Sequence, residues 1–387
     1  MIWPDLIWSG LFGFLPLLIW FVLLLGRGMF WRARERDDRL EPPQDLAQWP
    51  SVTAVVPARN EADVIKDTIG SLLAQDYPGK LRVILVDDES ADGTADAARA
   101  LDDGSKLTVI TGAKRPAGWT GKLWAVSQGV ARASKADPPD YLWLTDADIA
   151  HTPENLRHLV ARAEDGKLVL TSLMAKLHCQ SWPERFFIPA FVYFFDMLYP
   201  FAWVNDPSAR TAAAAGGCML IRREALEAAG GIAAIRGAII DDCAMGRLMK
   251  AQGPIWLGLT DRARSIRPYA GMGEIRRMVA RSAYAQLGYS PLMLLGTLVG
   301  LVLMFLAPPF WALFGEGGSW IAGAATWGLM AASFRPMLRF YGRSPLWGLA
   351  LPAIGLLYAL FTLDSAIQHW RGRGGMWKGR AQAMGRK

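Results

Sequence analysis

The sequence predicts an α/β fold with a mostly parallel sheet, flanked by apolar segments near both ends of the chain. Runs rich in β-branched residues recur from residue 51 onward, and each is followed by a helical pattern. This alternation is typical of a parallel sheet covered on both faces. Uncharged stretches of about 20 residues, the length that crosses a bilayer, lie outside this region. The 17 tryptophans suit a membrane-interface belt.

The expected strands are short apolar runs. They cover 52–57, 81–86, 107–110, 141–144 and 168–173, and helices are expected to run to about 75 and to begin near 94 and 152. Three of these strands end in polar clusters, at 58–61, 87–90 and 146–148. Because ligands of such sheets bind beyond the carboxyl ends of the strands, the clusters should meet in one crevice.

Asp146 and Asp148 stand one residue apart at the end of an apolar strand. Two carboxylates this close repel each other, and each loses water on burial. A divalent cation that also contacts phosphate oxygens would neutralise both, and hard oxygen ligands suit Mg²⁺ or Mn²⁺. The alternative is an exposed loop in which Asp-x-Asp occurs by chance.

Three motifs carry a family resemblance: Pro57-Ala58-Arg59-Asn60-Glu61, Asp87-Asp88-Glu89-Ser90-x-x-Gly93-Thr94 and Thr145-Asp146-Ala147-Asp148. In this order and spacing they resemble family 2 glycosyltransferases of the GT-A fold, from about residue 51 to 281. Within that family the chain is similar to the bacterial hopene-associated glycosyltransferases, which are relatives of ceramide glucosyltransferase. This closer similarity rests on Gly118-Trp119-Thr120-Gly121-Lys122, on Asp241-Asp242 and on the membrane layout.

The resemblance implies a nucleotide-sugar donor, a UDP-sugar, and a divalent metal. The residues that it assigns to the donor are Pro57, Ala58, Asn60, Glu61, Asp87, Asp88, Lys122 and Asp146. Asp148 would bind the metal on the diphosphate, with Asp146 contacting ribose or metal. Lys122 follows a glycine-bearing turn and would lie beside the diphosphate as a point charge. The alternative for Lys122 is a solvated lysine at the start of a helix.

The resemblance also implies an inverting transfer by direct displacement. Asp242 stands at the position of the family's general base, which takes the proton from the acceptor hydroxyl. Gly217 and Asp241 are expected near the sugar and the acceptor. The alternative for the two acids is capping of a helix N-terminus.

Arg281 stands where processive members of the family carry Gln-x-x-Arg-Trp. It would stabilise the leaving diphosphate, or bind a lipid phosphate as an interfacial arginine. Met278 and Ser282 replace the Gln and the Trp of that motif, which favours transfer of a single sugar.

Apolar segments predict a membrane-embedded protein. Residues 6–25 carry no charge and are followed by four arginines, which favours a retained anchor (1–28) over a cleaved signal peptide. A cytoplasmic catalytic domain (51–285), a transmembrane region (288–366) and a basic cytoplasmic tail (367–387) follow. Segments 291–314, 319–334 and 346–363 are the apolar candidates of the transmembrane region, the last as a re-entrant hairpin broken at Pro352 and Gly355.

Residues 182–204 are rich in aromatic side chains. They are expected as helices lying in the membrane interface, a wall for a lipid acceptor, with an ordinary core helix as the alternative. The predicted location is the bacterial inner membrane, crossed several times. The acceptor implied by the resemblance is a membrane lipid, a hopanoid or another polycyclic alcohol.

Other site classes find no support in the sequence. The three cysteines are far apart and the four histidines show no helical pairing, which argues against a zinc site. The formal net charge is +7, but the basic residues stand beside apolar segments, which fits anionic lipid better than nucleic acid. The remaining alternatives are a processive polysaccharide synthase and a non-catalytic lipid-binding scaffold that retains the fold.

Overall fold

The computed structural model describes residues 3–38, 46–102, 104, 106–135, 137–377 and 380–381. The chain divides into two compact units. The helical unit comprises Met1–Arg34, Cys179–Ala202 and Tyr269–Gly375, and the sheet unit comprises Glu35–His178, Trp203–Pro268 and Met376–Lys387. Residues 39–45, between the predicted anchor and the predicted catalytic domain, and most of the basic tail lie outside the described residues.

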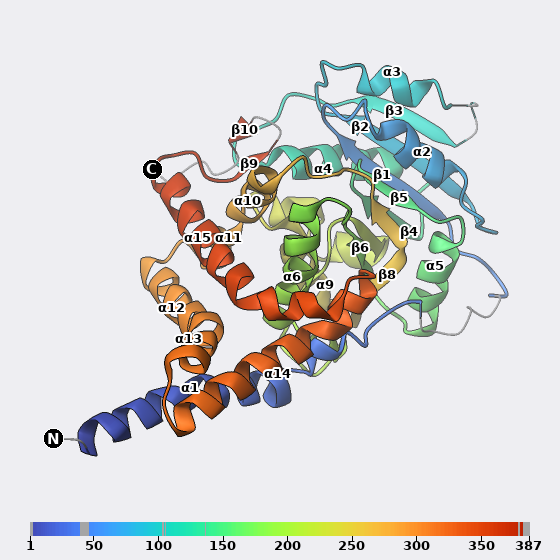
Figure 1. Ribbon diagram of the computed structural model, residues 1–387. Coiled ribbons are helices and arrows are strands. Elements are labelled where there is room, and N and C mark those ends of the chain that lie inside the picture. The colour runs from blue at the N-terminus through green and yellow to red at the C-terminus, as the bar shows by residue number, and fades with distance from the viewer. Residues whose placement is uncertain are drawn as a thin grey trace. The chain divides into compact units, whose positions relative to one another are not determined.

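The sheet unit is built on an eight-stranded mixed sheet with the order β3-β2-β1-β4-β7-β6-β8-β5 (Figure 1). The strands are β1 (Val52–Ala58), β2 (Leu81–Asp87), β3 (Leu107–Thr111), β4 (Tyr141–Thr145), β5 (Ile149–His151), β6 (Leu170–Lys176), β7 (Cys218–Arg222) and β8 (Ile255–Ser265). The first four strands along the chain pair in parallel. The predicted α/β architecture with a mostly parallel sheet is therefore confirmed. A separate pair is formed by β9 (Met376–Trp377) and β10 (Arg380–Ala381).

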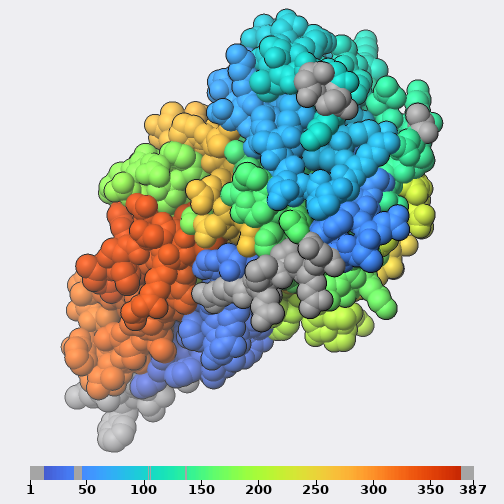
Figure 2. Space-filling view, turned by 90° about the vertical axis from the view of Figure 1, so that its right-hand side faces the viewer, coloured from blue at the N-terminus to red at the C-terminus, as the bar shows by residue number. Residues whose placement is uncertain are grey.

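Helices follow the strands as predicted. Those of the sheet unit are α2 (Ile65–Leu73), α3 (Thr94–Arg99), α4 (Gly121–Ala133), α5 (Asn155–Asp165), α8 (Arg223–Ala228), the 3₁₀ helix η2 (Ile232–Ile235) and α9 (Asp241–Lys250). A short helix, α7 (Phe201–Asn205), spans the boundary between the units. In the space-filling view, the blue and cyan residues that follow β1 and β2 form an outer surface of the sheet unit (Figure 2).

Both faces of β1 are covered, because its side chains alternate. Val52, Ala54 and Val56 belong to a buried cluster that also takes in the apolar faces of α2 and α5. Val55 faces the other way, toward α4. A Cβ added at Gly129 of α4 would lie 2.4 Å from Val55 Cγ1, so only glycine lets this helix approach so closely. The strand is consequently buried along its whole length.

The parallel register brings the carboxyl ends of three strands to one edge of the sheet. Ala58 pairs with Asp87, at the ends of β1 and β2. Val55 pairs with Leu144, so β4 ends beside β1 as well. The three polar clusters predicted from the sequence therefore follow neighbouring strands.

The helical unit contains most of the apolar segments. Its elements are α1 (Trp3–Gly26), η1 (Phe30–Arg32), α6 (Trp182–Leu198), α10 (Met272–Ala280), α11 (Ala283–Gln286), α12 (Pro291–Leu301), the π-helix η3 (Val302–Leu306), α13 (Ala307–Phe314), α14 (Gly318–Phe340), η4 (Pro345–Ala350) and α15 (Leu351–Trp370). Two helical segments of the described residues, Pro291–Phe314 and Pro345–Trp370, are long and apolar enough to cross a membrane by length and composition alone. The apolar helix Gly13–Gly26 is shorter, and α14 does not meet the same criterion.

Prolines explain the π-helical turn inside the segment Pro291–Phe314. Pro308 has no N–H to donate to the carbonyl four residues earlier, which belongs to Met304. The indole of Trp20 supplies the missing donor, with Nε1 2.8 Å from Met304 O. Trp20 is fully buried, so this bond satisfies a carbonyl that water does not reach.

The predicted re-entrant hairpin is wrong, because α15 runs unbroken from Leu351 to Trp370. Pro352 lies in the first turn of the helix, where a backbone N–H has no intrahelical partner to lose. Gly355 serves close packing, since a Cβ there would lie 2.5 Å from Phe305 Cγ. Neither residue breaks the helix.

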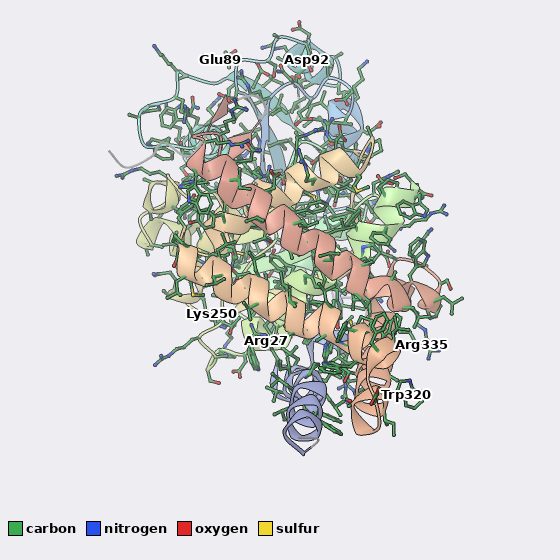
Figure 3. All side chains as sticks on the ribbon, turned by 60° about the vertical axis from the view of Figure 1, so that its left-hand side comes forward. Arg27, Glu89, Asp92, Lys250, Trp320 and Arg335 are labelled. Carbon is green, nitrogen blue, oxygen red and sulfur yellow. The ribbon has the colours of Figure 1, made fainter. Side chains whose placement is uncertain are left out.

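Helix α6 is held at both ends by side chains. Ser181 and Glu184 form a capping box at its start, and Glu184 Oε1 also accepts the N–H of Tyr269 at 2.8 Å. At its end, the Arg27 guanidinium donates to the carbonyls of Met197 and Leu198 (Figure 3). Many aromatic side chains of α6 are buried within the helical unit. The interfacial position of 182–204 stays a prediction.

Candidate active site

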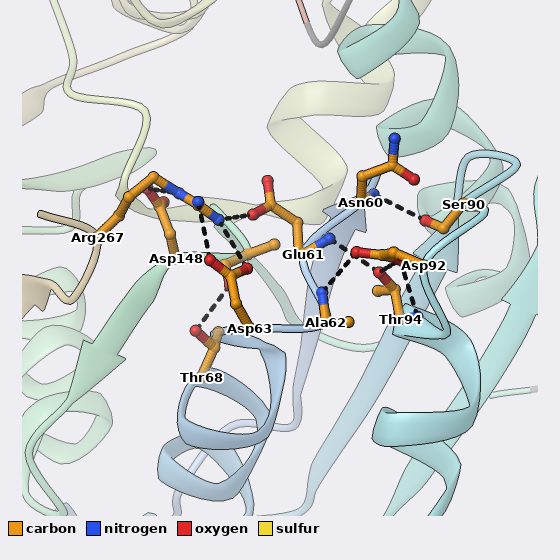
Figure 4. A network of polar contacts seen from close by, with 11 residues as sticks. Asn60, Glu61, Ala62, Asp63, Thr68, Ser90, Asp92, Thr94, Asp148 and Arg267 are labelled. Atoms are coloured by element: carbon orange, nitrogen blue, oxygen red, sulfur yellow. Dashed lines mark hydrogen bonds and ion pairs between the residues drawn. The ribbon is translucent and has the colours of Figure 1, made fainter. Parts of the chain in front are cut away.

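The ends of β1 and β2 are joined by polar contacts of their loops. Asn60 adopts a left-handed backbone conformation, with φ of 51°. Its N–H donates to Ser90 Oγ at 2.9 Å, and its side-chain oxygen accepts the N–H of Ala91 at 2.9 Å. Next to it, the Glu61 N–H donates to Thr94 Oγ1 at 2.8 Å (Figure 4). These bonds fix the loop that the sequence assigns to the donor nucleotide.

Two aspartates follow β2 at the same edge. Asp88 is almost completely buried, and its N–H donates to the carbonyl of Ala58 at 2.8 Å. Its carboxylate lies 3.6 Å from the Arg59 guanidinium. One buried carboxylate oxygen of Asp87, Oδ1, has no hydrogen-bond partner among the described residues. A buried oxygen of this kind is an acceptor that a ligand can use.

The Lys122 cluster consists of Lys122, Asp146, Asp241 and Asp242. Lys122 Nζ lies 2.7 Å from Asp146 Oδ1 and 3.0 Å from Asp241 Oδ2, and its side chain is only 19% exposed. Burial lowers the pKa of Lys122, but the three carboxylates outweigh it, and the net shift is upward. The lysine is therefore charged and ties the turn after β4 to the start of α9. Lys122 is therefore not a solvated lysine. Its role beside the diphosphate stays a prediction.

Asp242 is the member of this cluster at the predicted position of the base. Its Oδ1 accepts the N–H of Cys243 at 2.7 Å and its Oδ2 accepts the N–H of Gly216 at 3.3 Å. Burial, followed by the charge of Asp241, raises the pKa of Asp242 to about 6, and Lys122 opposes the shift. A carboxyl group that titrates near neutral pH can act as a general base. The bond to Cys243 in the first turn of α9 shows that Asp242 also satisfies the helix N-terminus.

The Arg267 cluster consists of Arg267, Glu61, Asp63 and Asp148 (Figure 4). Arg267 contacts Glu61 through Nη2 and forks onto the two carboxylate oxygens of Asp63 at 3.2 and 3.3 Å. Its Nε lies 3.7 Å from Asp148 Oδ2. Burial, Asp146 and Glu61 raise the pKa of Asp148 to about 6, although Arg267 lowers it.

Sequence reasoning missed Arg267 and Asp63. Arg267 lies 119 positions after Asp148 and belongs to none of the three motifs. Backbone pairing of β5 with β8 brings them together, with the Ile266 N–H donating to the carbonyl of Asp148 at 2.9 Å. A single sequence gives no sign of a pairing between strands so far apart. Asp63 follows the first motif by two positions and could have been included as a neighbour.

A buried hydrogen-bond relay behind the Asp146–Asp148 turn was also missed. Thr145 Oγ1 donates to the carbonyl of Gly217 at 2.8 Å. Its hydroxyl hydrogen is thereby used, so the contact of Thr145 Oγ1 with His151 Nε2 at 2.9 Å requires the histidine to donate. His151 Nδ1 then accepts from Asn155 Nδ2 at 3.1 Å. Burial lowers the pKa of His151 to about 3, so the ring is neutral, as this relay requires.

The Gly216–Gly217 turn is where this relay meets the Lys122 cluster. The Gly217 carbonyl accepts the hydroxyl of Thr145 at the end of β4, and the Gly216 N–H donates to Asp242 Oδ2. A Cβ at Gly216 would lie 3.2 Å from Lys122 Nζ, which explains the small residue there. The far end of α9 is anchored too, because Lys250 Nζ lies within 3.0 Å of the carbonyl oxygens of Trp203, Val204, Asp206 and Thr211, among which it shares its three hydrogens.

Most predicted site residues thus lie at one edge of the sheet. Lys122 directly joins Asp146 and Asp241, while Arg267 joins Glu61 and Asp148. Arg281 follows α10 and belongs to the helical unit. Its predicted role at the leaving group stays a prediction.

The donor set of the turn after β4 fits a divalent cation. Asp146 and Asp148 offer hard oxygen ligands. Burial, followed by the charges of Asp146 and Glu61, raises the pKa of Asp148, and a bound cation would offset both effects. Among the described residues, no cluster of three His, Cys, Asp or Glu side chains is arranged to hold a metal. Two carboxylates are enough where substrate phosphates complete the coordination, as is usual for Mg²⁺.

Comparisons with known proteins agree with this geometry. Residues 53–230 match the model of glycosyl transferase family 2. An N-acetylglucosaminyltransferase of Mesorhizobium japonicum is 26% identical over 196 residues, which are 48% of this chain and 42% of that protein. A poly-beta-1,6-N-acetyl-D-glucosamine synthase of Staphylococcus aureus is 27% identical over 137 residues, 35% of this chain and 31% of that protein. The chain spans less than half the length of these curated relatives.

The fold is similar to that of a solved glycosyltransferase. A mannosyltransferase from Pyrobaculum calidifontis, in complex with GDP-Man and Mn²⁺, superposes with a TM-score of 0.52 and 19% identity. The match covers 94% of this chain and 99% of that one. The predicted GT-A-like fold is confirmed. The predicted family 2 domain is supported by the match of residues 53–230.

Proposed function

We propose that this chain, which carries a glycosyltransferase family 2 domain, transfers a single sugar from a UDP-sugar to a membrane lipid with inversion at the anomeric carbon. The observation that carries the proposal is the Lys122 cluster. It places Asp242, a partly buried carboxyl group whose pKa is raised to about 6, beside the turn that bears Asp146. A general base next to a diphosphate site is the minimum that direct displacement requires.

The donor would bind along the edge formed by β1, β2 and β4. Asp87 Oδ1, beside the loop of Asn60 and Glu61, offers an acceptor for a uracil ring or ribose. Asp146 and Asp148 would hold a divalent cation, which, when bound, neutralises the charge of the leaving diphosphate. Lys122 would add positive charge for the same leaving group.

Asp242 would take the proton from the acceptor hydroxyl. As the acceptor oxygen forms its bond to the anomeric carbon, the bond from that carbon to the diphosphate oxygen breaks, and the proton moves to the Asp242 carboxylate. The Gly216 N–H and the Cys243 N–H hold this carboxylate in place. These two bonds therefore orient the Asp242 carboxylate, and the bond from Cys243 also satisfies an N–H at the start of α9.

A lipid acceptor at a bacterial inner membrane fits the composition of the helical unit. In the segment Pro291–Phe314, only 17% of the most apolar 18-residue stretch is buried. Leu292 and Phe314 are more than 70% exposed. Exposed apolar surface of this kind marks a membrane or partner contact. A hopanoid or other polycyclic alcohol as acceptor rests on the sequence resemblance alone.

The test is sugar transfer by the full chain, purified in detergent, to extracted bacterial lipids. Wild type, Asp242→Asn and a surface control, Asp96→Asn, are incubated with UDP-glucose or UDP-N-acetylglucosamine and Mn²⁺. We expect a lipid that gains one sugar, and a loss of turnover of at least ~100-fold in Asp242→Asn alone. UDP binding, measured by calorimetry, should be unchanged in both variants.

Two outcomes would overturn this proposal. Long polymeric products would favour a processive synthase, and UDP binding without product from any lipid extract would favour a scaffold. Full turnover in Asp242→Asn would place the base elsewhere.

A further inference from the structure

We infer that Arg267 is the resident cation of the donor site: it neutralises Asp148 while nucleotide and divalent cation are absent, and an arriving divalent cation displaces it from this carboxylate. The inference rests on the proposed function, because it assumes that Asp148 binds a metal. It adds a competing residue that lies outside the sequence motifs.

The backbone places Arg267 beside Asp148. Strand β8 pairs antiparallel with β5, which follows the Asp146–Asp148 turn directly. The pairing ends with the bond from the Ile266 N–H to the Asp148 carbonyl, and Arg267 is the next residue. Because Pro268 follows, Arg267 is restricted to extended backbone conformations. The backbone position of Arg267 is therefore set by the sheet, and its bonds to Glu61 and Asp63 orient the guanidinium.

The contacts of Arg267 are unequal. It forks onto Asp63 with two hydrogen bonds and donates to Glu61, which is nearly buried. With Asp148 it makes only an ion pair, at 3.7 Å from Nε to Oδ2, without a hydrogen bond. The contact with Asp148 is thus the one that can be exchanged at least cost, while Glu61 and Asp63 retain the arginine at the site.

The charges of the Arg267 cluster leave room for a further cation. Three carboxylates and one guanidinium sum to a formal charge of −2. A divalent cation bound to Asp148 would repel the Arg267 guanidinium, so the two cations compete for one carboxylate.

The competition is measured as the affinity of Mn²⁺ alone, without nucleotide, by electron paramagnetic resonance of the free ion. The proteins are the full chain in detergent, as wild type, Arg267→Gln and Arg264→Gln. Arg264 is the matched control, because it lies on β8 and donates to the Asp261 carbonyl outside the Arg267 cluster. We expect Mn²⁺ to bind about 5-fold or more tightly to Arg267→Gln, the usual lower range of coupling between two binding events, and unchanged to Arg264→Gln.

Two further variants locate the effect. In the Asp148→Asn background, Arg267→Gln should no longer tighten Mn²⁺ binding, because the contested carboxylate is gone. Arg267→Lys keeps the charge and should bind Mn²⁺ within about twofold of wild type, which also covers the case that Arg267→Gln fails to fold.

Mn²⁺ affinity that is unchanged or weaker in Arg267→Gln would overturn the inference, as would tightening that persists without Asp148. These results leave the proposed function untouched, since that is judged by sugar transfer in wild type. If wild type consumes no UDP-sugar but Arg267→Gln still binds Mn²⁺ more tightly through Asp148, the proposed function fails and the competition stands.

Discussion

The two aspartates of the Asp146–Asp148 turn are one residue apart, yet each faces a different cation. Asp146 is bound by Lys122 at 2.7 Å, whereas Asp148 lies 3.7 Å from Arg267. Lys122 is 19% exposed and its ammonium is shared with Asp241, on the helix that bears the base. Arg267 is 31% exposed, and its stronger bonds go to Glu61 and Asp63.

The difference indicates different roles for the two cations. Lys122 is partly buried and holds two carboxylates at once, so opening these ion pairs would leave uncompensated charge on both sides. The Lys122 cluster therefore acts as a fixed connection between the donor turn and α9. A loose pair at a half-exposed position can exchange partners at little cost. One side of the turn is thus held by the protein itself, and the other is available to a ligand.

The sharpest way to break this comparison is Lys122→Met, for which we expect the largest effect. The change leaves Asp146, Asp241 and Asp242 without this counter-charge. Breaking a fully buried pair costs about 3–5 kcal/mol, and this partly buried cluster should approach the lower end of that range. We expect a large fall in melting temperature at pH 7 and a loss of turnover of at least ~10-fold. Arg267→Gln should cost less, about 1–3 kcal/mol, because among the carboxylates that it pairs with only Glu61 is nearly buried.

The pH dependence of the Lys122→Met melting temperature separates charge from packing. Asp242 has a raised pKa, so its neutral form is favoured in the folded state, and the associated stability is present at low pH and lost as pH rises through about 6. Melting of Lys122→Met should therefore approach that of wild type at pH 5. An equal deficit at pH 5 and pH 7 would show that Lys122 matters for packing only.

A second prediction concerns the low-pH side of the pH–activity profile, here called the acid limb. Asp148 and Asp242 both titrate near pH 6, and both are needed as carboxylates, so activity should fall as pH drops through about 6. Protons and Mn²⁺ compete for Asp148 but not for Asp242. At limiting Mn²⁺ the limb should therefore lie at higher pH than at saturating Mn²⁺.

The measurement is kcat/KM from pH 4.5 to 8 at two Mn²⁺ concentrations. At saturating Mn²⁺ the fall of kcat/KM at low pH should reflect protonation of Asp242 alone. The pH of this fall should not change when more metal is added. A limb that ignores Mn²⁺ at all concentrations would contradict the assignment of Asp148 to the metal.

Local patterns in the sequence were sufficient to predict the strands and the acids that follow them. The apolar runs at 52–57, 81–86 and 141–144 match β1, β2 and β4 within a residue, because a strand buried on both faces leaves a continuous apolar signal. Parallel pairing then brings Asp87, Asp146 and Asp148 to one edge as a matter of geometry.

The partners of these acids could not be predicted, because they depend on pairings between distant segments. Arg267 reaches Asp148 only through the antiparallel contact of β8 with β5. No motif in the sequence indicates a partner for His151, yet in the fold its ring contacts Thr145 on one side and Asn155 on the other. Proline and glycine misled the prediction for α15, because Pro352 occupies a first turn and Gly355 a tight contact.

The smallest expected effect tests whether the relay behind the turn helps to position the Lys122 cluster. Thr145→Val removes the hydroxyl that accepts from His151 and donates to Gly217, and leaves two buried groups unpaired. Each unpaired group costs about 1–3 kcal/mol. Gly216, the residue before Gly217, donates its N–H to Asp242. We therefore expect turnover to fall a few-fold, with KM for the donor nearly unchanged.

The chain offers matched controls for this change. Thr53 and Thr171 are fully buried on β1 and β6, and neither hydroxyl has a hydrogen-bond partner among the described residues. Thr53→Val and Thr171→Val should therefore be neutral or stabilising, whereas Thr145→Ser should retain wild-type turnover by restoring the hydroxyl. If Thr145→Val lowers the melting temperature but leaves kcat at the level of the Thr171→Val control, the relay stabilises the sheet without positioning Asp242. The connection between donor turn and base would then run through Lys122 alone.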